Sequence, residues 1–148
     1  MAIRCELAED VAAPPARAFA AIDDLPLTAK WLPPCVQLEK VLPGPNAVGD
    51  QLKYTFKQGG KTSVMDGEIL ARTPGERVYC RYWDRAFEVL VDLRVAAAAG
   101  GSRLTHVIEI VPKTFLCKLF SPLIRLGLPK QTKEAMANLK KMLEAPSA

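Results

Sequence analysis

The sequence predicts an α+β domain in which an antiparallel sheet of about seven strands is covered by a long C-terminal helix. In one opening segment and in six segments between residues 36 and 110, apolar residues alternate with polar ones, a period typical of half-buried strands. Turn signals separate these segments at hairpin spacing, which indicates antiparallel neighbours. Within residues 112–145, apolar residues instead recur every three or four positions, as they do in amphipathic helices.

Residues 3–11 are predicted to form the first strand, because apolar side chains fall on one side of an extended segment and charged ones on the other. Pro14-Pro15 ends this strand and starts a short alanine-rich helix through Ile22, since proline loses no hydrogen bond at the first helical position. Asp23-Asp24 stops that helix and is predicted to cap a second short helix, which runs to about Leu32.

Six further strands follow, separated by turns rich in glycine, proline and aspartate. They are predicted at residues 36–41, 51–57, 61–71, 78–82, 87–95 and 103–110. The order is therefore one strand, two short helices, six strands and a final helix. An antiparallel sheet with one apolar face needs a cover, and the C-terminal helix is the only segment large enough.

The C-terminal segment contains two apolar bands. From Lys130 onward the pattern is that of a helix with one apolar and one basic face. The earlier band runs from Phe115 to Ile124, and Ser121-Pro122 within it is typical of a helix start. Gly127 followed by Pro129 is predicted to interrupt or kink the helix between the bands.

The earlier band has two interpretations. We favour the one in which it belongs to the lid of the sheet. The alternative arises from the basic residues interspersed between Phe115 and Lys130, which would suit a peripheral contact with a membrane surface or a protein partner.

Length and charge exclude several classes of protein. The chain has 148 residues and is 49% hydrophobic, which suits one domain, predicted to span residues 1–145 with a disordered tail at 146–148. Residues 113–148 hold seven basic and two acidic residues (+5), and residues 1–112 hold thirteen and fourteen (−1), which together give the net charge of +4. The basic excess is thus local, and no aromatic residues interleave with it, so we expect no nucleic-acid binding.

Neither a metal site nor a cofactor is expected. The four cysteines (Cys5, Cys35, Cys80 and Cys117) are far apart, and His106 is the only histidine. The first ten residues carry four charges and no apolar signal-peptide core, and no stretch approaches the roughly 20 apolar residues of a membrane span. We therefore expect a cytoplasmic protein with reduced thiols.

At this point the sequence shows a resemblance to a known family. The layout and several short motifs resemble the START-related helix-grip superfamily (SRPBCC), in the branch described as polyketide cyclase/dehydrase and lipid transport, over about residues 2–144. The motifs lie at Val11–Phe19, Trp31–Val36, Val48–Asp50, Gly67–Ile69 followed by Thr73–Gly75, and Ser102–His106.

The resemblance implies a curved sheet that wraps around the C-terminal helix and encloses an apolar cavity. It offers no catalytic motif that could be carried over residue by residue. Proteins of the superfamily carry lipids or hormones, cyclise polyketides or bind partners, so the fold leaves the function open.

Candidate ligand contacts follow from strand parity. His106 and Leu104 share a strand face and are both candidate contacts, and an imidazole among apolar neighbours can orient a ligand or handle a proton. Tyr54, Tyr82 and Trp31 have apolar bodies and polar tips that suit the wall of a pocket. Met65 is expected to fill irregular space beside them. All of these residues also suit an ordinary core.

Three hypotheses for function follow. The leading one is a protein that binds one small hydrophobic ligand, such as a lipid, polyketide or isoprenoid-like molecule, between sheet and helix, with no catalytic residue assigned. The second is a polyketide cyclase or dehydratase that uses His106 and a cavity tyrosine, and it requires a hydrogen-bonding partner for His106. The third is a protein-interaction module with a collapsed cavity.

Overall fold

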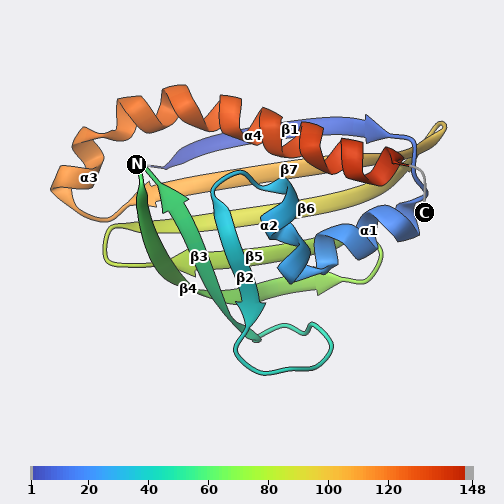
Figure 1. The fold of residues 1–148 in the computed structure, drawn as a ribbon, viewed down its shortest axis with the longest axis horizontal. Coiled ribbons are helices and arrows are strands. Elements are labelled where there is room, and N and C mark those ends of the chain that lie inside the picture. The colour runs from blue at the N-terminus through green and yellow to red at the C-terminus, as the bar shows by residue number, and fades with distance from the viewer. Residues whose placement is uncertain (1, 146–148) are drawn as a thin grey trace.

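A computed structural model describes residues 2–145 and shows one seven-stranded antiparallel sheet with helices on one side (Figure 1). The strand order is β1-β7-β6-β5-β4-β3-β2, so the first strand pairs with the last, and β1 and β2 form the two edges. The elements are β1 (Ile3–Val11), α1 (Pro15–Asp23), η1 (Leu25–Leu27), α2 (Thr28–Trp31), β2 (Cys35–Lys40), β3 (Gln51–Gln58), β4 (Lys61–Thr73), β5 (Arg77–Trp83), β6 (Phe87–Ala98), β7 (Gly101–Pro112), α3 (Phe115–Leu119) and α4 (Ser121–Glu144).

This architecture confirms the predicted fold class and the order of its elements. Each predicted strand is present, with ends that differ from the prediction by a few residues. The largest extension is at β6, which continues through Ala96-Ala97-Ala98 to the turn before β7. Alternation could not reveal this extension, because alanines carry no apolar or polar contrast. The predicted tail at 146–148 lies outside the described residues.

α4 lies along the β1 edge of the sheet and beside the short helices (Figure 1). Its C-terminal half supplies a fully buried row that includes Ala135, Met136 and Leu139. Two of the polar contacts between this half and the rest of the molecule involve main-chain atoms. Asn138 Nδ2 donates to the carbonyl oxygen of Trp31 in α2 at 3.1 Å, and Glu144 Oε2 accepts from the backbone N–H of Ala12 at 2.8 Å.

The C-terminal helix was predicted to be interrupted or kinked near Gly127 and Pro129, and the interruption is wrong. α4 runs without a break through Gly127 and Pro129, although Ser121-Pro122 begins it as expected. Proline removes one N–H donor, but Pro129 is exposed, so the unpaired carbonyl one turn earlier can be solvated. Buried neighbours on both sides, Leu128 and Thr132, hold the helix against the protein at this point.

The two aspartates after α1 do not cap a helix with their side chains. Neither α1, η1 nor α2 shows a side-chain cap at its N-terminus. Instead the Asp23 carboxylate accepts from Arg72 Nε at 2.9 Å and from Arg72 Nη2 at 2.8 Å, and also from Asn46 at 3.0 Å. This bidentate pair ties α1 to β4, a long-range partnership that local sequence rules do not consider.

The lid interpretation of the earlier apolar band is also wrong. No residue of α3 is buried, and Phe115, Leu116, Leu119, Phe120 and Leu123 are each at least half exposed. The cover of the sheet comes from α1, η1, α2 and the second half of α4. Within residues 2–145, no helix is both long and apolar enough to cross a membrane.

Candidate functional site

A cavity of about 70 Å³ lies between the inner face of the sheet and the short helices. Strands β2, β3, β5, β6 and β7 supply most of its wall, α1, η1 and α2 close it, and Gln131 is the contribution of α4. The lining is almost entirely apolar: Ile22, Leu25, Thr28, Trp31, Leu32, Leu38, Tyr54, Val78, Cys80, Tyr82, Val89, Val91, Leu93, His106, Ile108 and Gln131.

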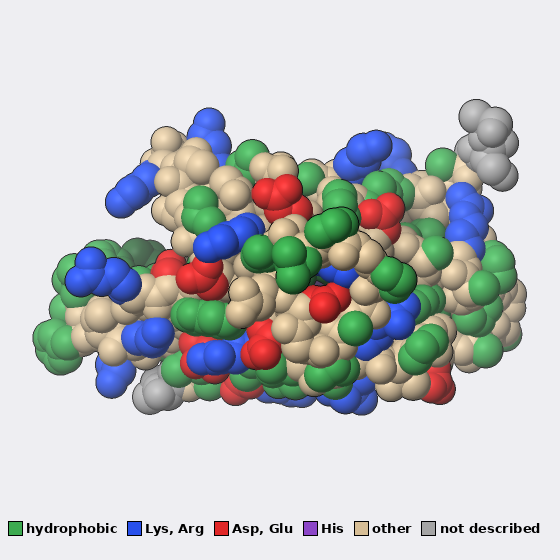
Figure 2. Space-filling view, turned by 90° about the horizontal axis from the view of Figure 1, so that it is seen from below, with side chains coloured by type: hydrophobic (Ala, Val, Ile, Leu, Met, Phe, Trp, Pro, Cys, Tyr) green, Lys and Arg blue, Asp and Glu red, His purple; other side chains and the backbone are tan. Residues whose placement is uncertain are grey.

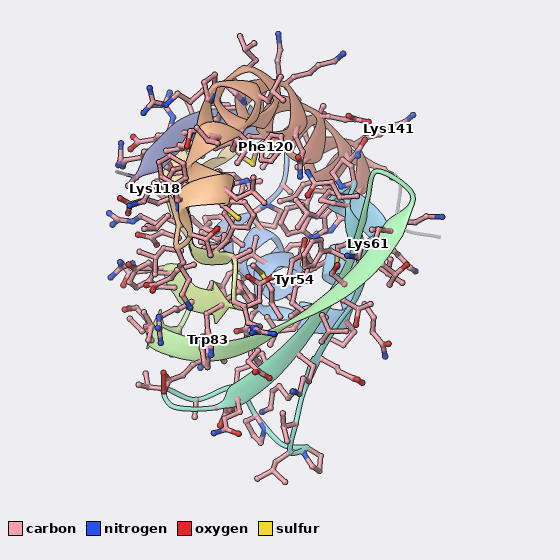
Figure 3. All side chains as sticks on the ribbon, turned by 90° about the vertical axis from the view of Figure 1, so that its left-hand side faces the viewer. Tyr54, Lys61, Trp83, Lys118, Phe120 and Lys141 are labelled. Carbon is pink, nitrogen blue, oxygen red and sulfur yellow. The ribbon has the colours of Figure 1, made fainter. Side chains whose placement is uncertain are left out.

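Four of the six candidate ligand contacts come together in this lining. They are His106, Tyr54, Tyr82 and Trp31, from β7, β3, β5 and α2. Figure 3 looks into the molecule from one end and shows Tyr54 in the interior, between the curved sheet and the helices. Residues from four separate elements therefore share one small space.

Met65 and Leu104 are buried but do not line the cavity. Met65 lies opposite Tyr54 in the β3–β4 pairing and Leu104 opposite Val95 in the β6–β7 pairing. Both residues thus support the wall and do not face the cavity. Strand parity predicts the face of the sheet on which a side chain lies, but not whether the space beside it is filled.

Two buried polar atoms of the cavity lining have no hydrogen-bond partner in the described part of the chain. They are the indole Nε1 of Trp31 and the imidazole Nδ1 of His106. The two rings meet edge to face, with centroids 6.1 Å apart and planes inclined by 82°. Leaving such a buried group unpaired costs about 1–3 kcal/mol, so both atoms favour any molecule that brings them a polar partner.

Burial keeps the titratable groups of the cavity uncharged at neutral pH. Desolvation lowers the pKa of His106 from 6.5 to about 4, so the imidazole is neutral. Desolvation also raises the pKa of the Cys80 thiol to about 12, and that of the Cys35 thiol, which is buried outside the lining, to about 11. The pKa values of Tyr54 and Tyr82 are raised for the same reason.

The two tyrosines form one aromatic wall. Their ring centroids are 5.2 Å apart, and the Tyr54 ring also stacks on Phe56 at 5.3 Å. Tyr82 fits at this position because its partner across β4–β5 is Gly67. A Cβ atom at position 67 would lie 2.6 Å from Cδ1 of the Tyr82 ring. Gly67 therefore makes room for the wall.

Sequence reasoning missed the residues that close the cavity. Leu25, Thr28 and Leu32 come from η1, α2 and the turn after them, whereas the sequence had indicated only the C-terminal helix as the cover. The inner row Val89-Val91-Leu93 of β6 could have been included by parity. Thr28 and Gln131 carry no sequence signal, because the periodicity of apolar residues does not select polar ones.

The lining determines the charge and polarity of a molecule that the cavity could accommodate. The lining contains no Asp, Glu, Lys or Arg, so a charged ligand would lose its hydration without compensation. Trp31 offers an N–H donor, and His106 offers a ring nitrogen that donates or accepts according to its tautomer. A neutral, mostly apolar molecule with one oxygen function fits this set. Within residues 2–145, no group of His, Cys, Asp and Glu could hold a metal ion.

Comparisons with known proteins agree with this geometry. The family model described as "Polyketide cyclase / dehydrase and lipid transport" matches residues 2–144. The comparison with curated proteins finds no match.

Several solved structures share the fold at low sequence identity. Protein CV1439 from Chromobacterium violaceum is 22% identical with a TM-score of 0.69, and the match covers 97% of this chain and 99% of that one. The structure of Ara h 8.0201 is 20% identical with a TM-score of 0.71, covering 97% and 98%. BexL, a di-domain ARO/CYC from the BE-7585A biosynthetic pathway, is 14% identical with a TM-score of 0.76; the match covers 99% of this chain and 51% of BexL.

Proposed function

Because the chain belongs to the polyketide cyclase/dehydrase and lipid transport family, we propose that it binds one small, neutral, hydrophobic molecule in the cavity between the sheet and the helices. One observation carries the proposal. The cavity is lined by apolar side chains and holds two buried polar atoms, on Trp31 and His106, that have no hydrogen-bond partner among residues 2–145. A ligand oxygen would satisfy these atoms while the apolar remainder of the ligand fills the aromatic and aliphatic wall.

The same cavity favours binding over catalysis. A cyclase or dehydratase that uses His106 needs a partner that orients the imidazole and passes a proton, and Nδ1 has none in the described chain. A histidine with a pKa of about 4 is a weak base at neutral pH. The raised pKa values of Tyr54 and Tyr82 make both hydroxyls weak acids. The site therefore holds a molecule better than it transforms one.

The size of the cavity limits what it can hold without rearrangement. Its volume of about 70 Å³ exceeds the space of a water molecule. It is well below the ~300–1,000 Å³ of pockets for drug-sized ligands. In the proposal, a larger ligand enters by separating α2 from α4, whose nearest polar link is the bond from Asn138 to the Trp31 carbonyl.

A filled cavity tests the proposal directly. We expect the protein to bind a neutral, environment-sensitive dye that carries a carbonyl group, at one site per chain. Val91→Trp places a large side chain in the lining and should weaken dye binding at least tenfold. The matched control is Val64→Trp on β4, where the side chain is 55% exposed and lies outside the lining. Equal binding by both variants would mean that the dye occupies the surface.

His106→Gln separates recognition from catalysis. Glutamine retains a polar tip but not the imidazole, so dye binding should weaken by about 1–2 kcal/mol, the scale of one buried hydrogen bond. The enzyme alternative predicts a different result. The wild type would turn over a polyketide-type substrate, and His106→Gln would lower that turnover by two or more powers of ten without changing binding. This result would overturn the proposal.

A further inference from the structure

A second feature of the molecule lies outside the cavity, at the end where α3 meets α4. Six large hydrophobic side chains within twelve residues are 50–78% exposed. We call this surface the apolar tip: Phe115, Leu116, Leu119, Phe120, Leu123 and Leu126. Figure 1 shows α3 projecting at one end of the molecule, and in Figure 2 hydrophobic side chains gather at that end with Lys and Arg beside them.

Helical geometry explains why the apolar tip faces away from the protein. Successive residues of an α-helix are about 100° apart around the axis. Leu123 and Leu126 therefore lie roughly 150° around α4 from the buried row that begins with Leu128 and Thr132. The one helix thus has an apolar stripe against the sheet in its second half and another on the opposite side in its first half.

The charged residues of the segment that forms the apolar tip all have one sign. Between residues 113 and 130 the chain has four basic residues, Lys113, Lys118, Arg125 and Lys130, and no acidic one. All four are exposed. Further along α4, Lys133 and Lys141 continue the exposed basic surface. Exposed apolar side chains flanked by cations are the composition of a helix that lies in a membrane interface.

From this arrangement we propose that the apolar tip docks on an anionic lipid membrane. Phe115, Leu116 and Leu119 enter the boundary between headgroups and acyl chains, while Lys118 and Lys130 contact lipid phosphates or carboxylates. The contact is peripheral. It does not depend on the ligand proposed for the cavity, because none of the tip residues lines that cavity.

The charge pattern favours an anionic membrane over two other binding partners, a second copy of the chain and a neutral protein groove. A second copy of the chain would bring the same cations against one another, which opposes association through this surface. A neutral protein groove would satisfy the apolar side chains but offer no opposite charge to Lys118 and Lys130. An anionic membrane accommodates both, since each basic residue near such a surface contributes about 1 kcal/mol.

Vesicle sedimentation tests the proposal with the full chain. We expect the protein to pellet with phosphatidylcholine vesicles that contain phosphatidylserine, and much less with phosphatidylcholine alone or at high salt. Leu119→Gln with Leu126→Gln should lower the partition coefficient at least tenfold. The matched control is Val36→Gln with Val64→Gln, two valines that are also about half exposed but lie on the sheet. It should bind like the wild type.

Charge reversal provides the second arm. Lys118→Glu with Lys130→Glu should lower partitioning by tenfold or more, whereas Arg17→Glu with Lys30→Glu, on α1 and α2, should change it far less despite the same net charge. Three results would overturn the proposal: equal binding to neutral vesicles, no effect of either tip variant, or a wild-type dimer that the leucine variant dissociates while vesicles remain unbound.

Discussion

His106 is the residue whose burial has the clearest measurable consequence. It is 2% exposed in the wall of the cavity, and desolvation lowers its pKa from 6.5 to about 4. An unfolded chain therefore takes up a proton near pH 6.5 that the folded chain accepts only near pH 4. Because the unfolded state binds more protons between these values, the free energy of unfolding should fall as the pH is lowered from about 6.5 to about 4.

The size of this pH effect can be predicted. The full shift corresponds to a loss of roughly 3 kcal/mol. Urea unfolding at several pH values in this window measures it, and His106→Gln should flatten the dependence, since the chain has no other histidine. A slope in the variant equal to that of the wild type would place the titrating group elsewhere.

Gly67 is a second residue with a specific steric role. A Cβ atom there would lie 2.6 Å from the Tyr82 ring and 3.1 Å from Cβ of Leu52. Gly67→Ala should therefore displace the ring and lower the free energy of unfolding by about 1–3 kcal/mol. Gly127→Ala is the control, because nothing lies within 4 Å of an added Cβ in that helix. It should stabilise by about 0.5–1 kcal/mol in the same thermal or urea titration.

For single residues, the sequence predicted correctly which face of the sheet a side chain occupies. Parity placed His106, Tyr54 and Tyr82 on the inner face, where they line the cavity. The same parity applies to Met65, which is buried but faces filled core instead. Alternation predicts the face of the sheet on which a side chain lies, but not whether that part of the face borders a cavity. It therefore cannot distinguish residues that line a cavity from residues of the surrounding core.

At the scale of elements, α4 combines two environments in one helix. Leu139 is fully buried, whereas Leu126 is 78% exposed. Leu139→Ala should cost about 2–5 kcal/mol of unfolding free energy, because it removes a buried side chain and leaves a cavity. Leu126→Ala makes the same chemical change in the exposed half and should stay within about 0.5 kcal/mol of the wild type. Comparable losses in both variants would contradict the described packing.

The same helix shows what periodicity can and cannot predict. Both apolar bands have a helical period, and both are helical in the structure. The apolar side chains of the two bands, however, lie on different sides of the helix axis, and only those of the second band face the sheet. The assignment of the first band to the lid failed because a period identifies an apolar stripe without showing what covers it. The Asp23–Arg72 pair was missed for a related reason, since its partners are far apart in sequence.

At the scale of the whole molecule, the fold followed from the order of elements. Six alternating segments at hairpin spacing leave few arrangements other than an antiparallel sheet, and the structure confirms this one. The pairing of β1 with β7, which places the first strand beside the last, could not be deduced from hairpin logic. That pairing puts His106 opposite Leu7 and brings α4 to the β1 edge.

The contact between α2 and α4 predicts how easily the proposed cavity opens. Asn138→Ala removes the bond to the Trp31 carbonyl, which is worth about 1 kcal/mol. If opening between these helices limits dye entry, association should become roughly fivefold faster with little change in the equilibrium constant. Stopped-flow fluorescence measures both, with Lys141→Ala as an exposed control on the same helix. An unchanged association rate would indicate another entrance.

The exposed start of α4, before Leu128, also has a consequence for amide hydrogen exchange. A helix without buried side chains depends on its own backbone bonds, and short helices of this kind are marginal in water. In the seven residues Ser121–Gly127 no side chain is buried, and Pro129 removes one of the bonds that would tie them to the second half. Backbone amide protons of Ser121–Gly127 and of α3 should therefore exchange quickly, through local opening of the helix. Those around Leu139 should exchange much more slowly, because their exchange requires global unfolding.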